Sequence, residues 1–112
     1  MPDCIFCKIA SGETATKIVH EDDVAMAFKD LNPAAPTHLL VIPKKHIAGL
    51  GAVDKGDEAL LGHLQGVIGT VAAANGLKDF RVVVNNGRGA GQSVFHLHYH
   101  VLSGRRMTWP PG

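Results

Sequence analysis

"FHLHYHVL", residues 95–102, is the stretch that decides how this chain is interpreted. Histidines alternate in it with large apolar residues, which is the two-residue period of a β-strand. The period predicts a strand over 95–102 with His96, His98 and His100 on one face. Imidazole acts as nucleophile, acid or base near neutral pH. Because like charges depress one another's pKa, we expect at least one neutral, reactive ring here.

A glycine-rich segment, "NNGRGAGQS" at residues 85–93, directly precedes this strand. It leads into a strand rather than a helix, which excludes a P-loop and a dinucleotide-binding fingerprint. Glycines let backbone N–H groups approach an anion closely, and Asn85, Gln92 and Ser93 add side-chain donors. Donors beside a neutral imidazole suit a phosphoryl centre. The two features together predict an anion-binding loop joined to a nucleophile.

The bulk composition is that of one globular domain spanning residues 1–112. Of the 112 residues, 46% are hydrophobic and 19% are charged, and the formal net charge is +1. Such a charge gives no electrostatic footprint for nucleic acid. No apolar run approaches the roughly 20 residues of a membrane helix, and no secretory signal is recognisable. We therefore expect a cytoplasmic protein that binds neither nucleic acid nor membrane.

The strongest helix signal lies at residues 57–75, where apolar side chains recur on one helical face. Asp54 or Asp57 can cap its start, and Gly76 can end it in the left-handed conformation. A shorter helix or turn is expected at residues 4–10. Strands are predicted at residues 17–22, 24–30, 38–43, 80–86 and 95–102. Mostly consecutive strands with one long helix predict an α+β fold with a five-stranded antiparallel sheet.

Gly62, Gly66 and Gly69 lie inside the predicted long helix. Each weakens a helix by up to ~1 kcal/mol relative to alanine. One interpretation is that another backbone packs closely there, as in a subunit contact. The other is that the glycines are simply tolerated, and the sequence does not decide between the two.

Cys4 and Cys7 form a single C-x-x-C and are the only cysteines of the chain. In a reducing compartment this pattern favours metal or redox chemistry over a structural disulfide. A zinc ribbon needs a second C-x-x-C, which is missing, and a redox dithiol normally follows a strand. His46 and His96 are candidates to complete a Cys₂His₂ site.

Four more polar residues have weaker contexts. Asp30 follows a strand, where it either starts a turn or binds the two hydroxyls of a ribose, and spacing does not decide which. His38 opens an apolar strand and either points into a site or marks the strand end. His20 and His63 have no supporting context, so we interpret both as surface residues.

"HLHYHVL" fits His-φ-His-φ-His-φ-φ and resembles the signature of the histidine triad (HIT) family. "DLNPAAPTHLLVIPKKHI" (30–47) and "NNGRGAGQSVFHLHYHVL" (85–102) resemble the core blocks of its Hint-type branch, the purine nucleoside phosphoramidases. "IFCKIASGE" (5–13) and "GRRMTWPPG" (104–112) resemble the terminal segments of that branch. The resemblance implies a five-stranded antiparallel sheet with helices, in a homodimer whose sheet is continuous across both subunits.

The implied reaction is hydrolysis of a nucleoside 5′-phosphoramidate, such as adenosine 5′-phosphoramidate, or of an acyl-adenylate. His98 would attack the α-phosphorus and form a covalent nucleotidyl-histidine, with a backbone carbonyl fixing its tautomer. His100 and Ser93 would contact the phosphate and help protonate the leaving nitrogen, and His38 would support the triad. The resemblance also implies phosphate contacts at Asn85, Gln92 and the backbone of Ser93, a ribose contact at Asp30, and a substrate contact at Gly91. The implied base pocket consists of Ile5, Phe6, Ile9, Phe28 and Leu31.

Bacterial relatives that begin with C-x-x-C also resemble this chain. They imply a structural zinc ion on Cys4, Cys7, His46 and His96, and no organic cofactor. Thr14-Ala15 departs from the Ile-Pro that Hint-type proteins often carry near the base pocket, which affects the purine preference. The alternatives are a dinucleoside polyphosphate hydrolase, a nucleotide-binding or scaffold protein with incidental catalysis, and a zinc module.

Overall fold

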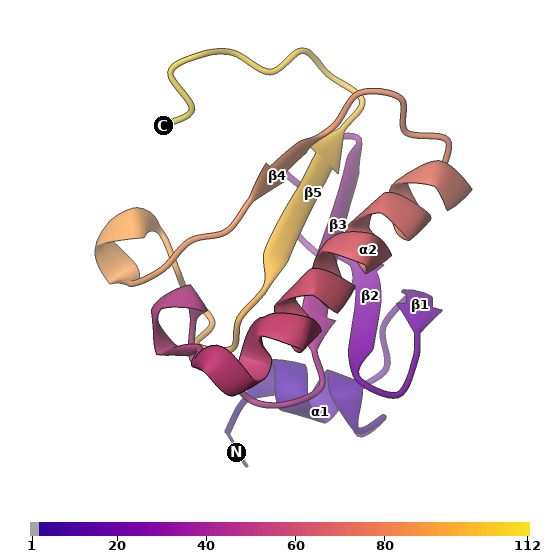
Figure 1. The fold of residues 1–112 in the computed structure, drawn as a ribbon. Coiled ribbons are helices and arrows are strands. Elements are labelled where there is room, and N and C mark those ends of the chain that lie inside the picture. Colours follow the sequence, from indigo (N-terminus) through magenta and orange to yellow (C-terminus); the bar gives the residue numbers. More distant parts are fainter. Residues whose placement is uncertain (1–2) are drawn as a thin grey trace.

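The computed structural model describes residues 3–112 and shows a five-stranded antiparallel sheet with one long helix packed on it (Figure 1). In the sheet the strands lie in the order β1-β2-β3-β5-β4, and every neighbouring pair is antiparallel. The strands are β1 (Ile18–Glu21), β2 (Ala25–Lys29), β3 (Thr37–Pro43), β4 (Arg81–Val83) and β5 (Tyr99–Ser103). The predicted α+β fold and its five-stranded sheet are confirmed.

The helices are α1 (Ile5–Ala10), α2 (Glu58–Ala74) and the 3-10 turns η1 (Leu50–Ala52), η2 (Lys55–Asp57) and η3 (Arg88–Ala90). The entry to α2 is fixed by a capping box, in which Asp54 and Asp57 each accept a backbone N–H. Gly76 follows α2 with φ of +67°, the left-handed conformation that favours glycine. Both ends of the long helix therefore follow the sequence prediction.

The two helices cover opposite faces of the sheet, and strand alternation decides which side chains each face receives (Figure 1). On one face Ala27, Leu39, Val41 and Val101 pack against Leu64, Val67, Ile68 and Val71 of α2. On the other face Met26, Phe28, Leu40 and Ile42 pack against Phe6 and Ile9 of α1. Leu40 pairs with His100 across β3 and β5, so His100 lies on the face that α1 covers.

The strand predicted over 95–102 is shorter than expected, because β5 begins at Tyr99. The N–H of Leu97 donates to the carbonyl of Ile47 (2.7 Å) rather than to a neighbouring strand. Of the three histidines, only His100 therefore lies on the strand, so the predicted strand was too long. The predicted common face is confirmed: the rings of His96 and His98 lie against Phe6 of α1, and the His100 ring lies beside His98. Leu97, Tyr99 and Val101 belong to the core on the α2 face.

β4 is also shorter than the predicted strand at residues 80–86, since it ends at Val83. Val83 pairs with His100, and β4 has no residue left to pair with the chain before β5. The segment before β5 is instead held by contacts of its histidines with main-chain carbonyls, His96 with Pro43 and His98 with His96.

His63 is exposed and His20 is partly exposed, in line with the prediction that both are surface residues, but the two histidines share one acceptor. Their Nε2 atoms lie 2.8 Å and 2.7 Å from the same oxygen, Oδ2 of Asp22. The other oxygen of Asp22 accepts the N–H groups of Val24 and Ala25. This carboxylate therefore joins the β1–β2 turn to the middle of α2.

The glycines of α2 meet no close neighbour within the described chain. A Cβ built at Gly62, Gly66 or Gly69 would have no atom of residues 3–112 within 4 Å. No helix among these residues is long and apolar enough to cross a membrane.

Candidate active site

The ring of His98 is oriented by the main chain of its own segment. Its Nδ1 lies 2.7 Å from the carbonyl oxygen of His96. Because a carbonyl only accepts, Nδ1 carries the proton and Nε2 carries the lone pair. The ring is buried and packs edge-on against Phe6, with 5.1 Å between centroids. A neutral imidazole with a fixed tautomer is suited to nucleophilic attack.

His38 and His100 form a second oriented pair beside it. The N–H of Ala34 donates to Nδ1 of His38 (2.9 Å), so Nε2 of His38 carries the proton. That Nε2 lies 2.9 Å from Nδ1 of His100 and donates to it. Nε2 of His100 is then the N–H donor of its ring, and the rings of His98 and His100 lie 4.9 Å apart.

Burial keeps this pair uncharged at neutral pH. Desolvation, reinforced by the neighbouring rings of His98 and His38, lowers the pKa of His100 to about 4. Burial also lowers the pKa of His38, and the Asp30 carboxylate opposes that effect without reversing it. Oδ2 of Asp30 lies 3.4 Å from Nε2 of His38. The N–H directions assigned above are those of neutral rings.

His98 and His100 lie at the wall of a cavity of about 270 Å³. Its apolar end is formed by α1 and β2, and its polar end by the two imidazoles and the Ser93 hydroxyl. The lining residues are Ile5, Phe6, Ile9, Thr14, Ala15, Thr16, Phe28, Lys29, Asp30, Leu31, Asn32, Leu40, Ser93, Val94, His98 and His100. A cavity with an apolar body and a few convergent polar groups is typical of a small-molecule site.

Most of the predicted substrate-binding residues meet in this cavity. The five residues expected at the base, Ile5, Phe6, Ile9, Phe28 and Leu31, all line it. Asp30 lies beside them, and its Oδ1 accepts the N–H of Asn32 (2.8 Å). Their contacts with a base and a ribose stay predictions.

Of the residues expected to contact phosphate, Ser93 alone is among the lining residues of this cavity. Asn85, Gly91 and Gln92 are outside its lining. The side chain of Gln92 is fully engaged with the backbone: Nε2 donates to the carbonyls of Ala48 and Val94, and Oε1 accepts the N–H of Gly87. Gln92 therefore braces the loop, and its contact with phosphate stays a prediction.

Several lining residues were not singled out from the sequence: Thr16, Lys29, Asn32, Leu40 and Val94. For Leu40 a signal existed, since it follows His38 by two residues on β3 and so shares its face. The others lie in loops or at strand ends, where no periodicity indicates the direction of a side chain.

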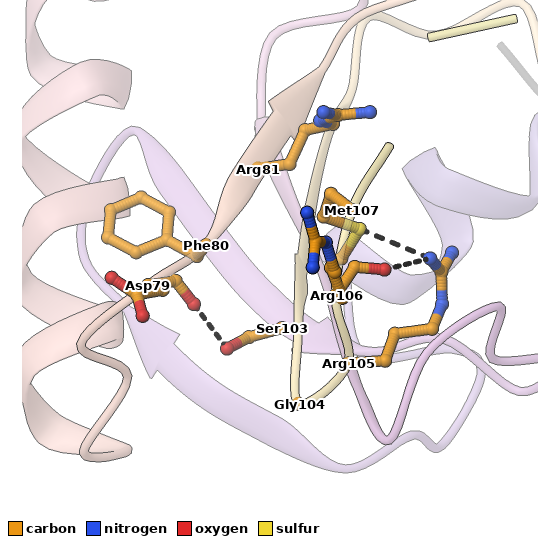
Figure 2. Close-up of a pocket in the computed structure, with 8 residues that line it drawn as sticks. All are labelled: Asp79, Phe80, Arg81, Ser103, Gly104, Arg105, Arg106 and Met107. Atoms are coloured by element: carbon orange, nitrogen blue, oxygen red, sulfur yellow. Dashed lines mark hydrogen bonds between the residues drawn. The ribbon is translucent and has the colours of Figure 1, made fainter. Parts of the chain in front are cut away.

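A larger cavity, of about 700 Å³, lies where β4 and the segment after β5 diverge (Figure 2). Arg81, Arg105 and Arg106 reach its walls, and the Arg105 guanidinium donates to the carbonyl of Arg106 (3.3 Å). None of the triad histidines lines it. We therefore place the active site in the smaller cavity.

A compact group of sulfur and nitrogen donors lies behind the active site. Sγ of Cys4 is 3.3 Å from Nδ1 of His96, and Sγ of Cys7 is 3.3 Å from Nδ1 of His46. One ligand atom from each of the four residues lies within 4.8 Å of all the others. The C-x-x-C and the two histidines considered in the sequence thus come together, from α1, the loop after β3 and the loop before β5.

The donor set fits a tetrahedral zinc ion. Bonds of about 2.0–2.3 Å place the ligands of such an ion roughly 3.5 Å apart. Nε2 of His96 donates to the carbonyl of Pro43 (2.7 Å), which leaves the lone pair of Nδ1 directed at the sulfurs. Burial lowers the pKa of His96 and keeps it neutral, as a ligand must be.

Comparison with known proteins gives close matches over nearly the whole chain. The family model described as "Scavenger mRNA decapping enzyme C-term binding" matches residues 3–109. An uncharacterised HIT-like protein of Synechocystis is 54% identical over 111 residues, covering 98% of this chain and 97% of that protein. A 14 kDa zinc-binding protein of Zea mays is 46% identical over 111 residues, covering 96% and 87% respectively.

Solved structures agree with these sequence matches. A HIT family hydrolase from Legionella pneumophila is 49% identical with a TM-score of 0.95, and the match covers 98% of this chain and 100% of that one. A histidine triad protein from Clostridium difficile is 45% identical with a TM-score of 0.92, and the match covers 96% of each chain. With such identity over such coverage, the chain belongs to the histidine triad (HIT) family.

Proposed function

We propose that this HIT-family protein is a hydrolase of the Hint-type branch, which cleaves nucleoside 5′-phosphoramidates of the AMP type. The hydrolase class is supported by the match to a protein described as a HIT family hydrolase. The observation that carries the reaction is the 2.7 Å contact from Nδ1 of His98 to the His96 carbonyl. It leaves Nε2 of His98 unprotonated at the wall of a nucleotide-sized cavity.

In the first step Nε2 of His98 attacks the α-phosphorus. A bond forms between Nε2 and phosphorus, and the bond from phosphorus to the leaving nitrogen breaks with its electron pair on nitrogen. The leaving nitrogen needs a proton to depart as an amine. The hydroxyl of Ser93 lines the same cavity and can pass on a proton that it regains from solvent water, while Nε2–H of the neutral His100 donates a hydrogen bond to a phosphoryl oxygen. A positioned proton donor contributes about 10²–10⁴-fold.

In the second step water attacks the phosphorus and breaks the bond to Nε2. The water oxygen becomes part of the AMP phosphate, and its proton restores the donor used in the first step. His98 returns to the tautomer that the His96 carbonyl favours, because Nδ1 keeps its proton throughout. His38 holds the ring of His100 in place through both steps.

The nucleoside part of the substrate is proposed to occupy the apolar end of the cavity. Phe6 and Phe28 form an edge-on aromatic pair there, with 5.5 Å between centroids. Such rings suit the flat face of a purine. Asp30 lies between this end and the imidazoles, where a carboxylate accepts hydrogen bonds from the ribose hydroxyls.

We further infer that zinc binds Cys4, Cys7, His46 and His96. The donor geometry supports this, and a maize relative is named a zinc-binding protein. With four protein ligands no position remains for water or substrate, so bound zinc supplies a structural cross-link rather than a catalytic centre. No organic cofactor is needed for the proposed chemistry.

We also propose that residues 1–112 form one domain that pairs as a homodimer, with a sheet continuous across both subunits. β4 is an edge strand of the sheet, and its Val82 is 39% exposed. A free edge with apolar side chains is a template for strand pairing. The space beside Gly62, Gly66 and Gly69 permits close approach of a second copy to α2.

Mass spectrometry tests the reaction directly. The protein is mixed with adenosine 5′-phosphoramidate, quenched without acid, digested and analysed, and we expect an AMP-sized adduct on the peptide that contains His98. A parallel incubation with a diadenosine polyphosphate tests the alternative activity, that of a dinucleoside polyphosphate hydrolase. Turnover without any adduct would exclude the covalent route, and cleavage of the dinucleotide alone would assign the alternative function.

A further inference from the structure

Helix α1 takes part in two sites at once. Cys4 caps its N-terminus and Cys7 follows in its first turns, and both sulfurs face the histidines of the metal-binding cluster. The next residues along the same short helix, Ile5, Phe6 and Ile9, line the nucleotide cavity. A shift of α1 therefore alters both sites together.

A second cavity reaches the metal-binding cluster from the other side of α1. It measures about 440 Å³, and Cys4 and His46 lie in its wall. Ile5, Ser93 and Val94 line this cavity and the nucleotide cavity alike. These three residues separate the second cavity from the nucleotide cavity, and Cys4 and His46 are reached from the second cavity.

α1 depends on few attachments for its position. It has six residues, and a helix of that length is unstable by itself in water. Phe6 and Ile9 pack onto β2 and β3. The sulfurs of Cys4 and Cys7 supply the remaining link to the body of the protein, and without an ion that link consists of weak sulfur–nitrogen contacts.

We propose that zinc on the Cys4–Cys7–His46–His96 cluster sets the affinity of the nucleotide cavity for the base, by fixing α1 as its wall. The inference rests on the proposed function, since it concerns a bound nucleotide. It assigns to the cluster a role in substrate affinity in addition to stability. Phe6 transmits the effect, because its ring contacts both Phe28 and His98.

The hydrogen bond that orients the His98 ring involves no metal-ligating atom. Nε2 of His96 remains bonded to the Pro43 carbonyl on the side away from the cluster, and the His96 carbonyl that holds His98 is main chain. Loss of zinc therefore acts on α1 first. The expected change lies in binding of the base and not in the phosphoryl end of the cavity.

Isothermal titration calorimetry with AMP tests the proposal on three proteins: the zinc-loaded form, the same protein stripped with a chelator, and His46→Asn. We expect AMP to bind at least tenfold more weakly to both zinc-free forms. Ribose 5-phosphate lacks the base, and its affinity is measured by competition with AMP. We expect that affinity to differ by less than twofold among the three proteins. Lys8→Ala is the matched control, because it changes α1 without touching either site, and it should keep both zinc and AMP affinity.

Hydrogen exchange supplies a readout that needs no nucleotide. Zinc alone should slow exchange of the α1 amides while β3 and β5 stay unchanged. Equal AMP affinity with and without zinc would overturn the inference and leave the proposed function standing. Loss of protection throughout β3 and β5 on stripping, or weaker AMP binding by zinc-loaded Lys8→Ala, would also overturn it. Failure of the zinc-loaded protein to bind AMP would overturn both proposals.

Discussion

Nε2 of His38 lies 2.9 Å from Nδ1 of His100 and donates its proton to it. The bond joins β3 to β5 on the face that α1 covers, and it decides which nitrogen of His100 keeps a proton for the substrate. His38, on the strand next to β5, therefore sets the direction in which the N–H of His100 points.

Replacement of His38 by alanine is expected to slow turnover without weakening substrate binding. The lost hydrogen bond is worth about 1 kcal/mol, or roughly fivefold in kcat, and KM should change little because His38 does not line the cavity. Steady-state kinetics on adenosine 5′-phosphoramidate measures both constants. His63→Ala, which removes a histidine from α2, is the control and should keep both. A rise in KM with constant kcat would contradict the assigned role.

His98→Ala should abolish turnover and retain AMP binding, since it removes the nucleophile while most of the cavity wall remains. Single-turnover kinetics and calorimetry check the two halves of this prediction. His98→Asn is the second variant: it fills more of the buried space than alanine does, so a loss of activity in it is less readily explained by misfolding. Substantial activity in either folded variant would exclude His98 as the nucleophile.

Mild acid should destabilise the zinc-free protein through its buried histidines. The pKa of His100 falls from 6.5 to about 4 on folding, so the unfolded chain binds protons first as the pH drops. Stability is then lost between about pH 6.5 and pH 4, and this group contributes no pH dependence above that window. Thermal melts across the range measure the slope, and His100→Gln should make it shallower. An unchanged slope in that variant would mean that His100 is not buried in its neutral form.

Asp30→Ala should weaken binding of ribonucleotides selectively. Hydrogen bonds to a charged group contribute about 1.5–3 kcal/mol, and a ligand without ribose hydroxyls cannot form them. Calorimetry with AMP and with its 2′,3′-dideoxy analogue compares the two cases. The substitution should cost affinity for AMP and leave that of the analogue nearly unchanged. An equal loss for both ligands would place Asp30 in a structural role.

Val82→Lys should convert the proposed dimer to a monomer, because it places a charge on the free edge of β4. Val24→Lys is the matched control, since Val24 is 45% exposed in the β1–β2 turn at the other side of the sheet. Sedimentation velocity gives the mass of each. A wild-type protein that sediments as a monomer would contradict the dimer outright.

Local patterns predicted the regular elements well. The apolar period of α2 and its capping aspartates lie within one chain segment, so local sequence is enough to predict the helix. Short apolar runs likewise indicated the strands. The histidine segment was harder, because its alternation resembles that of a strand. Only the contact of Leu97 with Ile47, far apart in the sequence, shows that the chain leaves the sheet before Tyr99.

Side chains that serve the backbone were the hardest to predict. The sequence did not indicate that the Gln92 amide forms three hydrogen bonds with backbone groups. The carboxylate of Asp22 contacts both His20 and His63, and no sequence motif links these two histidines. Such pairings depend on where loops meet in space, which composition and periodicity do not encode.

The oxygen that selects the reactive form of the His98 ring belongs to a peptide group. No amino-acid replacement removes this main-chain oxygen, whereas a side-chain carboxylate that oriented the ring would be lost by a single substitution. The tautomer of the proposed nucleophile therefore depends on the path of the main chain. Engineering of this protein can therefore alter the residue at position 96 and its metal affinity, and the nucleophile keeps its tautomer as long as the turn before it keeps its shape.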